Sequence, residues 1–224
     1  PLRSTNFSDE YWKNVFKNFI DEYSKGRTPN PDILCNKEVK FKAFLNYAKD
    51  LGGVKIATGH YARIKESGHS YQLLKGVDDD KDQSYFLYLL SQEMLTNSLF
   101  PIGGIEKQEV RKIAKENGLL NHAKKDSTGI CFIGEQKKFK EFLKRYIPKY
   151  PGVIKSVDGE ICGEHEGLSY YTIGQRKGLG VGGGFGNNDD PWYVSEKDLS
   201  SNTLIICLLY TSPSPRDKRQ SRMP

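Results

Sequence analysis

The chain has 224 residues, of which 37% are hydrophobic and 28% charged, and its formal net charge is +6. A chain of this length can bury one sizeable core or two modest ones, and the composition is that of a folded, soluble protein. No run approaches the roughly 20 apolar residues of a membrane-spanning helix, and the first residues lack a signal-peptide pattern. We therefore expect a cytoplasmic protein that works without a membrane.

The first half of the chain predicts an α/β arrangement. Ser8 is the expected N-cap of a helix whose apolar residues recur at helical spacing as far as Tyr23, and Gly26 ends that helix. A second amphipathic helix is expected from about Lys37 to residue 51, before a pair of glycines. These two helices precede a short apolar run that is typical of a buried strand.

That predicted strand covers residues 54–57, and the turn at residues 58–60 follows its carboxyl end. In open α/β sheets ligands bind at this edge. Alternating residues at 61–64 and 71–74 predict a hairpin around Gly68. Helical patterns then return at residues 83–90, 107–117 and 136–146.

From Pro151 onward the helical patterns stop, and short strands alternate with turn residues. This pattern predicts a small β-barrel that begins near residue 150. After residue 206 a Ser/Pro/Arg-rich run abandons the strand pattern and resembles translated cloning or adaptor sequence. We exclude residues 207–224 from the fold prediction on that ground.

The four cysteines are the most informative residue type for chemistry. They form no C-x-x-C motif, and no histidine lies at zinc-ligand spacing from them, so neither a bound metal nor a structural disulfide is predicted. A transient catalytic disulfide stays possible. The cysteines are Cys35, Cys131, Cys162 and Cys207.

Cys35 and Cys131 stand in turn-rich contexts. Pro29 and Pro31 predict an extended segment that presents Cys35 where a loop meets the helix near Lys37. A thiolate at a helix N-terminus is stabilised by the unpaired N–H groups there, and the thiolate is the nucleophile. The alternative is that each cysteine is a small buried apolar residue.

A second cluster combines basic and aromatic side chains between residues 137 and 150. Such a mixture suits a phosphate backbone and stacked bases. The alternative is an ordinary helix with a buried aromatic face and a solvated lysine face. The basic residues are Lys137, Lys138, Lys140, Lys144, Arg145 and Lys149.

Five segments together resemble a known family. They are GRTPNPDILCN (26–36), IATGHYAR (56–63), KDQSYFL (81–87), DSTGICFIG (126–134) and YTIGQRKGLG (171–180). These motifs occur in the order seen in the bacterial tRNA-specific 2-thiouridylases, and the resemblance runs from about residue 6 to 206. Five long motifs in register are far more specific than one short fingerprint.

The resemblance implies an enzyme that uses ATP to adenylate the C2 oxygen of the wobble uridine of tRNA and then replaces it with persulfide sulfur. ATP, with Mg²⁺, is thus the expected co-substrate, and no permanently bound cofactor is expected. The expected partners are tRNA and a persulfide donor, either a sulfur relay protein or a cysteine desulfurase.

The resemblance also assigns roles to residues. Cys131 carries the persulfide, Cys35 is the second thiolate, which takes Cys131 into a transient disulfide, and Asp32 shuttles a proton or holds the base. The remaining assignments are Asn30, Pro31 and Asp32 to the target base, Gly59 to ATP, and His60, Lys81, Asp82 and Gln83 to tRNA. Without the resemblance, a helix cap explains Asp32 equally well, whereas Asp82 is better explained as the cap of the helix at residue 83 and His60 as a hydrogen-bonded residue at a strand end.

The family's Ser-Gly-Gly phosphate loop is not found in this chain. We therefore expect a fragment that is itself inactive. Residues 1–75 are expected to form the back part of an α/β domain of the adenine-nucleotide alpha-hydrolase-like (PP-loop) kind. A helical tRNA-binding region (76–150), the start of a β-barrel (151–206) and a non-native tail (207–224) are expected to follow. The alternatives are a non-catalytic tRNA-binding module and a thiol redox enzyme.

Overall fold

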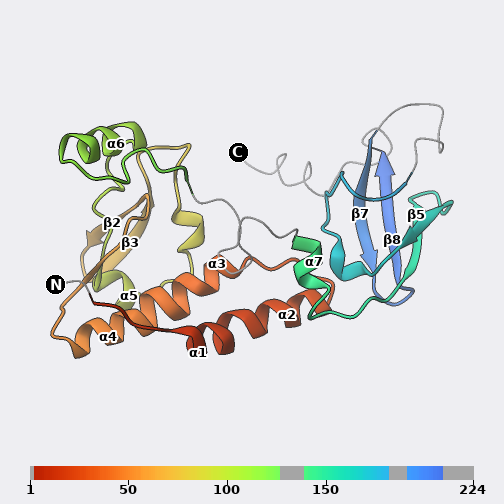
Figure 1. The fold of residues 1–224 in the computed structure, drawn as a ribbon, viewed down its shortest axis with the longest axis horizontal. Helices are drawn as coiled ribbons and strands as arrows, with labels where there is room; N and C mark the ends of the chain where they lie inside the picture. The colour runs from red at the N-terminus through yellow and green to blue at the C-terminus, as the bar shows by residue number, and fades with distance from the viewer. Residues whose placement is uncertain (1–2, 127–138, 182–190, 209–224) are drawn as a thin grey trace. The chain divides into compact units, whose positions relative to one another are not determined.

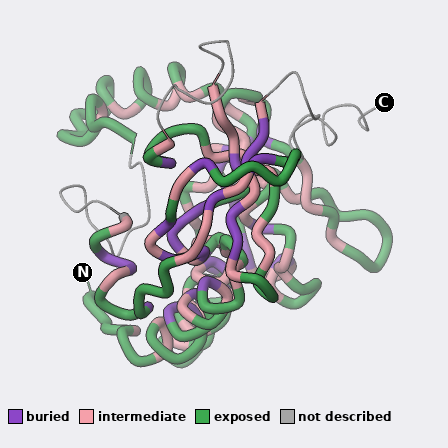
Figure 2. Tube along the Cα trace, turned by 90° about the vertical axis from the view of Figure 1, so that its right-hand side faces the viewer, coloured by how far each residue is buried: buried purple, intermediate pink, exposed green. Residues whose placement is uncertain are grey.

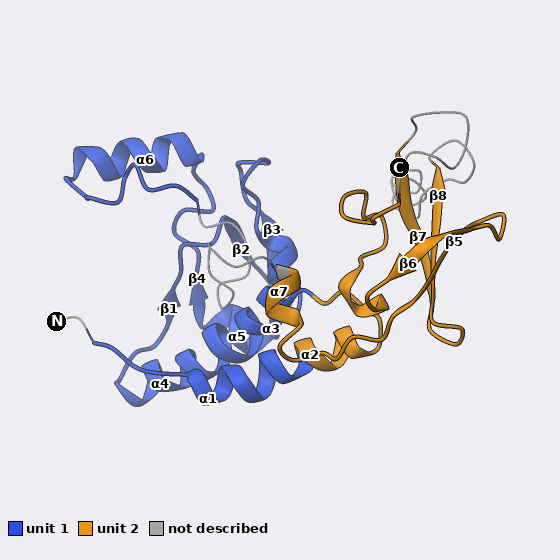
Figure 3. Ribbon diagram, turned by 45° about the vertical axis from the view of Figure 1, so that its right-hand side comes forward, with its two compact units in different colours: residues 1–18, 30–135 blue, residues 19–29, 136–224 orange. Residues whose placement is uncertain are grey.

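The computed structural model describes residues 3–126, 139–181 and 191–208 (Figure 1). The chain divides into two compact units, the first formed by residues 1–18 and 30–135 and the second by residues 19–29 and 136–224 (Figure 3). In the described part, no helix has the length and apolar character needed to cross a membrane.

The N-terminal helical run consists of α1 (Ser8–Tyr11), η1 (Trp12–Phe16), which is π-helical, and α2 (Lys17–Ser24). Phe7, not Ser8, is its N-cap residue, and the Phe7 side chain forms no capping hydrogen bond; Asn6 Oδ1 accepts a hydrogen bond from the backbone N–H of Ser8 at 2.9 Å. The predicted end is confirmed: Gly26 has φ +72°, a conformation that glycine adopts without strain.

The second helical run starts earlier than predicted. It consists of α3 (Pro31–Leu34), the π-helical η2 (Cys35–Ala43) and α4 (Phe44–Asp50). The expectation that Pro31 lies in an extended segment is wrong, because proline fits the first position of a helix, where no N–H is needed. Cys35 therefore lies inside the helix, one turn beyond its N-terminus.

Two small sheets follow in the first unit. β1 (Ile56–Ala57) pairs in parallel with β4 (Ser98–Leu99), and the antiparallel hairpin of β2 (Ala62–Ser67) and β3 (Ser70–Lys75) turns at Gly68, as predicted. The strand predicted at residues 54–57 is present but shorter.

The helix predicted at residues 83–90 is wrong. Only a 3-10 turn, η3 (Ser84–Phe86), forms there, and the unpredicted helix α5 (Gln92–Thr96) begins after Ser91, whose side chain caps it. The next helix, α6 (Lys107–Glu116), agrees with the prediction and ends before Gly118.

A cluster of buried apolar side chains lies in the first unit; Figure 2 marks buried residues in purple. It joins the second helical run to the hairpin and to the strand pair, since each element contributes a buried apolar side chain. The members are Phe41, Leu45, Ile56, Ala62, Leu87 and Phe100.

The second unit contains a four-stranded sheet of order β6-β5-β8-β7. Its strands are β5 (Gly152–Ser156), β6 (Ile161–His165), β7 (Trp192–Asp198) and β8 (Thr203–Leu208), with the 3-10 turn η4 (Leu168–Tyr170) between β6 and β7. β5 and β8 run in parallel and the other pairs are antiparallel. β8 continues two residues past position 206, where the strand pattern was expected to stop.

The short helix α7 (Phe139–Leu143) precedes this sheet. The Tyr170 hydroxyl donates a hydrogen bond of 2.6 Å to the carbonyl oxygen of Ile147 and so fastens the segment after α7 to the turn η4. Residues 136–138 of the predicted helix, and residues 209–224 of the predicted tail, lie outside the described part of the chain.

Candidate functional site

A pocket of about 580 Å³ lies within the first unit. It is built from the second helical run, the turn after β1, the segment around η3, the start of α6 and Asp126. Its lining is predominantly polar and carries charges of both signs. The lining residues are Asp32, Asn36, Lys40, Gly59, His60, Tyr61, Asp80, Lys81, Asp82, Gln83, Tyr85, Phe86, Lys107 and Asp126.

One face of the second helical run supplies three of these side chains. Asp32, Asn36 and Lys40 are spaced four residues apart, and such a spacing places side chains on the same face of a helix. The position of Asp32 is set by Asn30, whose Oδ1 accepts a hydrogen bond from the Asp32 backbone N–H at 3.1 Å. Asn30, and not Asp32, is thus the cap of this helix.

Burial raises the pKa of the Asp32 carboxyl group above its ordinary value, and the positive charge of Lys40 partly opposes that effect. A carboxyl group with a raised pKa exchanges a proton more readily near neutral pH than an ordinary aspartate. The arrangement is therefore compatible with proton transfer at Asp32.

His60 follows β1 directly, after Thr58 and Gly59. Its Nδ1 lies 2.8 Å from Thr58 Oγ1, and its ring packs near Phe41 and Phe100. Burial, together with the charge of Lys40, lowers the pKa of His60 to about 4. At neutral pH this imidazole is uncharged, so it can offer a ligand hydrogen bonds but no positive charge.

Asp82 and Gln83 both bind backbone groups that flank the hairpin. Asp82 Oδ1 accepts a hydrogen bond from the Gly76 N–H at 2.9 Å, and Gln83 Oε1 accepts one from the Tyr61 N–H at 3.1 Å. The same Asp82 carboxylate also accepts from Ser84, whose backbone begins η3. These contacts fix the wall of the pocket and explain why a tight turn replaces the expected helix.

A cluster of three cations surrounds Asp126. Its carboxylate lies 2.8 Å from Lys107 Nζ, 3.1 Å from Lys81 Nζ and 3.4 Å from a guanidinium nitrogen of Arg111. Hydrogen bonds from Lys107 and then Lys81 lower its pKa to about 2. Asp126 is also the first residue of the segment 126–134, so the cluster fixes where that segment begins.

The pocket brings together six of the residues singled out from the sequence: Asp32, Gly59, His60, Lys81, Asp82 and Gln83. Asn30 and buried Pro31 start the helix, and Cys35 is half-buried in its second turn; none of these three lines the pocket. Cys131 lies outside the described residues.

Sequence reasoning missed the other lining residues, which are Asn36, Lys40, Tyr61, Asp80, Tyr85, Phe86, Lys107 and Asp126. Two of them could have been predicted, because Asn36 and Lys40 continue the four-residue spacing that begins at Asp32. The spacing was overlooked because the segment around Pro31 was expected to be extended and not helical. Tyr85 and Lys107 reach the pocket through tertiary contacts that the local pattern does not contain.

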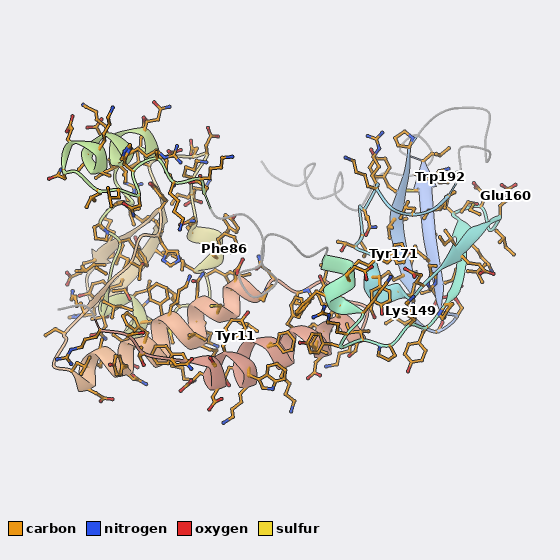
Figure 4. All side chains as sticks on the ribbon, viewed as in Figure 1. Tyr11, Phe86, Lys149, Glu160, Tyr171 and Trp192 are labelled. Atoms are coloured by element: carbon orange, nitrogen blue, oxygen red, sulfur yellow. The ribbon has the colours of Figure 1, made fainter. Side chains whose placement is uncertain are left out.

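The basic cluster predicted at residues 137–150 is partly neutralised in the second unit. Glu166 forms ion pairs with Lys140, Lys144 and Lys149, and Lys140 also lies over the ring of Tyr171 (Figure 4 labels Lys149 and Tyr171). The lysines hydrogen-bonded to Glu166, first Lys140 and then Lys149, lower its pKa to about 2. Glu166 carries one negative charge, so it offsets one of the three positive charges that it contacts, and the cluster keeps a net positive charge.

The described residues hold no group of three or more His, Cys, Asp or Glu side chains that could bind a metal ion. The fold and the site together define an α/β domain with a polar pocket beyond the end of a parallel strand, followed by an all-β domain.

Comparison with known proteins identifies this combination. The family model described as "tRNA methyl transferase HUP domain" matches residues 1–135, and the model described as "tRNA methyl transferase PRC-barrel domain" matches residues 140–208. The chain belongs to the family that these models define.

Curated relatives agree with this assignment. The chain is 59% identical over 213 residues to a protein of Proteus mirabilis, 61% over 207 residues to one of Hydrogenovibrio crunogenus and 57% over 213 residues to one of Shewanella amazonensis, each named tRNA-specific 2-thiouridylase MnmA. These matches cover 95%, 92% and 95% of the chain but 58%, 54% and 56% of the relatives. The chain thus spans little more than half the length of these relatives, and the resemblance stated from its motifs is confirmed.

Proposed function

We propose that this chain carries the base-binding and sulfur-handling part of a tRNA-uridine 2-sulfurtransferase, which transfers persulfide sulfur to C2 of the wobble uridine in an ATP-dependent reaction. The observation that carries the proposal is the pocket itself. Residues from four of the five motifs, Asp32, His60, Lys81 and Asp126, line one cavity although they are far apart in sequence.

The chemistry explains why such a pocket is needed. The C2 oxygen of uracil leaves poorly, so it first attacks the α-phosphorus of ATP, and pyrophosphate is released. The terminal sulfur of a persulfide on Cys131 then attacks C2, and AMP leaves. Finally the Cys35 thiolate attacks the inner sulfur of Cys131, so that a Cys35–Cys131 disulfide forms and the transferred sulfur stays on C2.

Within this scheme Asp32 has the clearest role. It lies on the same helix as Cys35, one turn earlier, and its raised pKa suits a group that holds or moves a proton during the displacement. His60 is uncharged at neutral pH and hydrogen-bonded through Nδ1, so we assign it to RNA contact rather than to charge neutralisation. Lys81 also lines the pocket, where its ammonium group is paired with the Asp126 carboxylate.

Gly59 is the proposed point of contact with ATP. A Cβ atom at this position would meet only Ile102 Cδ1, at 3.9 Å, so the backbone there is open to a ligand. Mg²⁺ enters, in this proposal, with the ATP phosphates, because magnesium in nucleotide sites is held largely by phosphate oxygens and water. The Cys131 persulfide comes from a donor protein, either a sulfur relay protein or a cysteine desulfurase.

The test is to follow labelled sulfur. The chain is incubated with a cysteine desulfurase and labelled cysteine, and the sulfur-bearing peptide is identified by mass spectrometry without reduction. We expect label on Cys131 in the wild type and in Cys35→Ser, and none in Cys131→Ser. Cys162→Ala is the matched control, because this cysteine is buried in the second unit and has no part in the scheme.

Two results would contradict the proposal. Label on Cys35 with none on Cys131 would reverse the roles of the two cysteines. Label on Cys131 that moves to a small-molecule thiol, together with no binding of tRNA, would favour a thiol redox enzyme.

A further inference from the structure

The cations around Asp126 carry more charge than that carboxylate can offset. Lys81, Lys107 and Arg111 all pair with it, so three positive charges face a single negative one. Among the described residues, no other carboxylate forms an ion pair with these three cations. We call the three cations the basic triad. The triad and Asp126 together therefore keep a net positive charge beside the pocket.

The basic triad can be reached from solvent. The side chains of Lys81, Lys107 and Arg111 are 40%, 26% and 44% exposed. Lys81 and Lys107 also belong to the residues that line the cavity, as does Asp126. A ligand that enters this part of the pocket can therefore contact the ammonium groups directly.

Contacts other than those to Asp126 hold two of these cations in place. Lys107 Nζ lies over the ring of Tyr61, 5.2 Å from its centre. Arg111 donates a hydrogen bond of 3.1 Å to the backbone oxygen of Lys124. Lys107 and Arg111 are four residues apart on α6 and so share one face of that helix. The positions of these two cations therefore do not depend on the Asp126 carboxylate alone, and another anion could take its place.

The acidic and basic side chains nearby are distributed unevenly. The remaining carboxylates of the pocket lining are Asp32, Asp80 and Asp82, and within the described ranges none of them is paired with the triad. Lys124 and Lys125, which directly precede Asp126, are both exposed. An anion is therefore best accommodated on the side of the pocket that α6 forms.

We infer that the basic triad is a binding site for a phosphate group of the RNA backbone, in which the Asp126 carboxylate takes the place of the phosphate while no RNA is bound. This inference rests on the proposed function. A nucleotide whose base enters the pocket near Asp32 brings its own phosphate with it, so one cavity serves both parts of the nucleotide. Lysine and arginine bind phosphate oxygens through charge-assisted hydrogen bonds. A backbone phosphate carries one negative charge, as does the carboxylate that it replaces.

The experiment measures binding of a labelled anticodon stem–loop RNA to the chain by fluorescence anisotropy at several salt concentrations. Lys107→Gln and Arg111→Gln should each weaken binding about tenfold, because each removes a charge-assisted hydrogen bond. Each should also reduce the slope of log K against log salt by about 1, the change expected for one lost phosphate contact. Asp126→Asn should strengthen binding, because it removes the competing charge and keeps the size of the side chain.

Lys112→Gln is the matched control, because it removes one positive charge from the same helix. Its side chain is 63% exposed and pairs with Glu109, outside the basic triad. Since α6 contains no buried residue, none of the substitutions on this helix should prevent folding. Equal weakening in Lys112→Gln and Arg111→Gln would overturn the inference, because it would show an effect of overall charge only.

The double variant Arg111→Gln, Asp126→Asn separates phosphate binding from a structural role. If Arg111 contacts the phosphate, Arg111→Gln weakens RNA binding in the Asp126→Asn chain as well. If Arg111 only holds Asp126, its loss has no effect in that chain. The second result overturns the inference and leaves the proposed function intact.

A further arm distinguishes the phosphates of ATP from those of RNA. Binding of a fluorescent ATP analogue is measured with the same variants, and we expect Arg111→Gln to leave it unchanged. Weaker binding of the analogue, together with unchanged RNA binding, would assign the triad to ATP and overturn the inference. Failure of the wild-type chain to bind the RNA at all contradicts the proposed function itself.

Discussion

Asn30 and Asp32 are joined by the hydrogen bond that starts the helix carrying Cys35. Asn30 Oδ1 accepts from the Asp32 N–H at 3.1 Å, and Pro31 between them occupies the first helical position. Because Asp32 is fixed in the first turn, Asn36 and Lys40 follow on the same face at one-turn intervals. The cap therefore aligns three pocket residues at once.

The first prediction concerns this cap. Asn30→Ala should destabilise the first unit by about 1 kcal/mol, because an N-cap side chain satisfies a backbone N–H that is otherwise unpaired. Asn30→Asp should retain most of the stability. The measurement is the midpoint of thermal unfolding, together with hydrogen exchange of the amides at the start of the helix.

Asn14→Ala serves as the control, since Asn14 is exposed in the preceding helical run. An equal loss in the two alanine variants would show that the Asn30 cap makes no specific contribution.

A second prediction concerns three glycines of the first unit, of which Gly59 lines the pocket. A Cβ atom at Gly103 would lie 1.6 Å from the Ala62 backbone oxygen, whereas at Gly59 it meets only Ile102 Cδ1 at 3.9 Å. Gly103→Ala should therefore destabilise the chain by about 3 kcal/mol, through a clash that only backbone movement relieves. Gly59→Ala should unfold close to the wild-type midpoint.

Gly104→Ala is the control for the change from glycine to alanine, because nothing lies within 4 Å of a Cβ atom there. Similar midpoints for the Gly103 and Gly104 variants would mean that the packing between Gly103 and the hairpin is wrong.

The third prediction is a pH dependence caused by His60. Its pKa in the folded state is about 4, below the ordinary value of 6.5, first because of burial and then because of Lys40. The unfolded chain therefore takes up a proton as the pH falls below 6.5, while the folded chain does not until about pH 4. The free energy of unfolding should therefore decrease as the pH falls from 6.5 to about 4, by at most about 3 kcal/mol.

His60→Gln should flatten this loss, as measured by urea unfolding at pH 7 and pH 5. His69→Gln removes an exposed imidazole at the tip of the hairpin. In this variant the loss of stability from pH 7 to pH 5 should equal that of the wild type. A His60→Gln chain that loses as much stability as the wild type would show that another group is responsible.

The fourth prediction concerns Glu166. Glu166→Gln removes the negative charge that pairs with Lys140, Lys144 and Lys149. If these lysines meet RNA, tRNA binding should strengthen at low salt, and the slope of log K against log salt should steepen by about 1 to 2. The free energy of unfolding should fall by no more than about 3 kcal/mol, because each of the three exposed ion pairs contributes at most about 1 kcal/mol.

Glu164→Gln is the matched control, since Glu164 is an exposed carboxylate of β6 outside this cluster. An unchanged slope in Glu166→Gln would assign these lysines to the structure of the second unit and not to RNA contact.

The amino-acid sequence by itself determined the features that depend on local interactions. Gly26, Gly68 and Gly118 end or turn the chain where expected, because a positive φ is a property of the single residue. The hairpin and α6 follow from periodicity in the same way. The family was also identifiable, since its motifs are read directly from the residues.

Only the tertiary structure decided which side chains share the pocket. The segment after Gln83 is a short turn because Gln83 binds the backbone of Tyr61, which precedes the hairpin, and Asp82 binds that of Gly76, which follows it; these bonds outweigh local helix preference. Likewise, the side-chain amide of Asn36 is held by the backbone oxygen of Phe86, fifty residues away. Contacts between residues so far apart in sequence leave no local pattern to read.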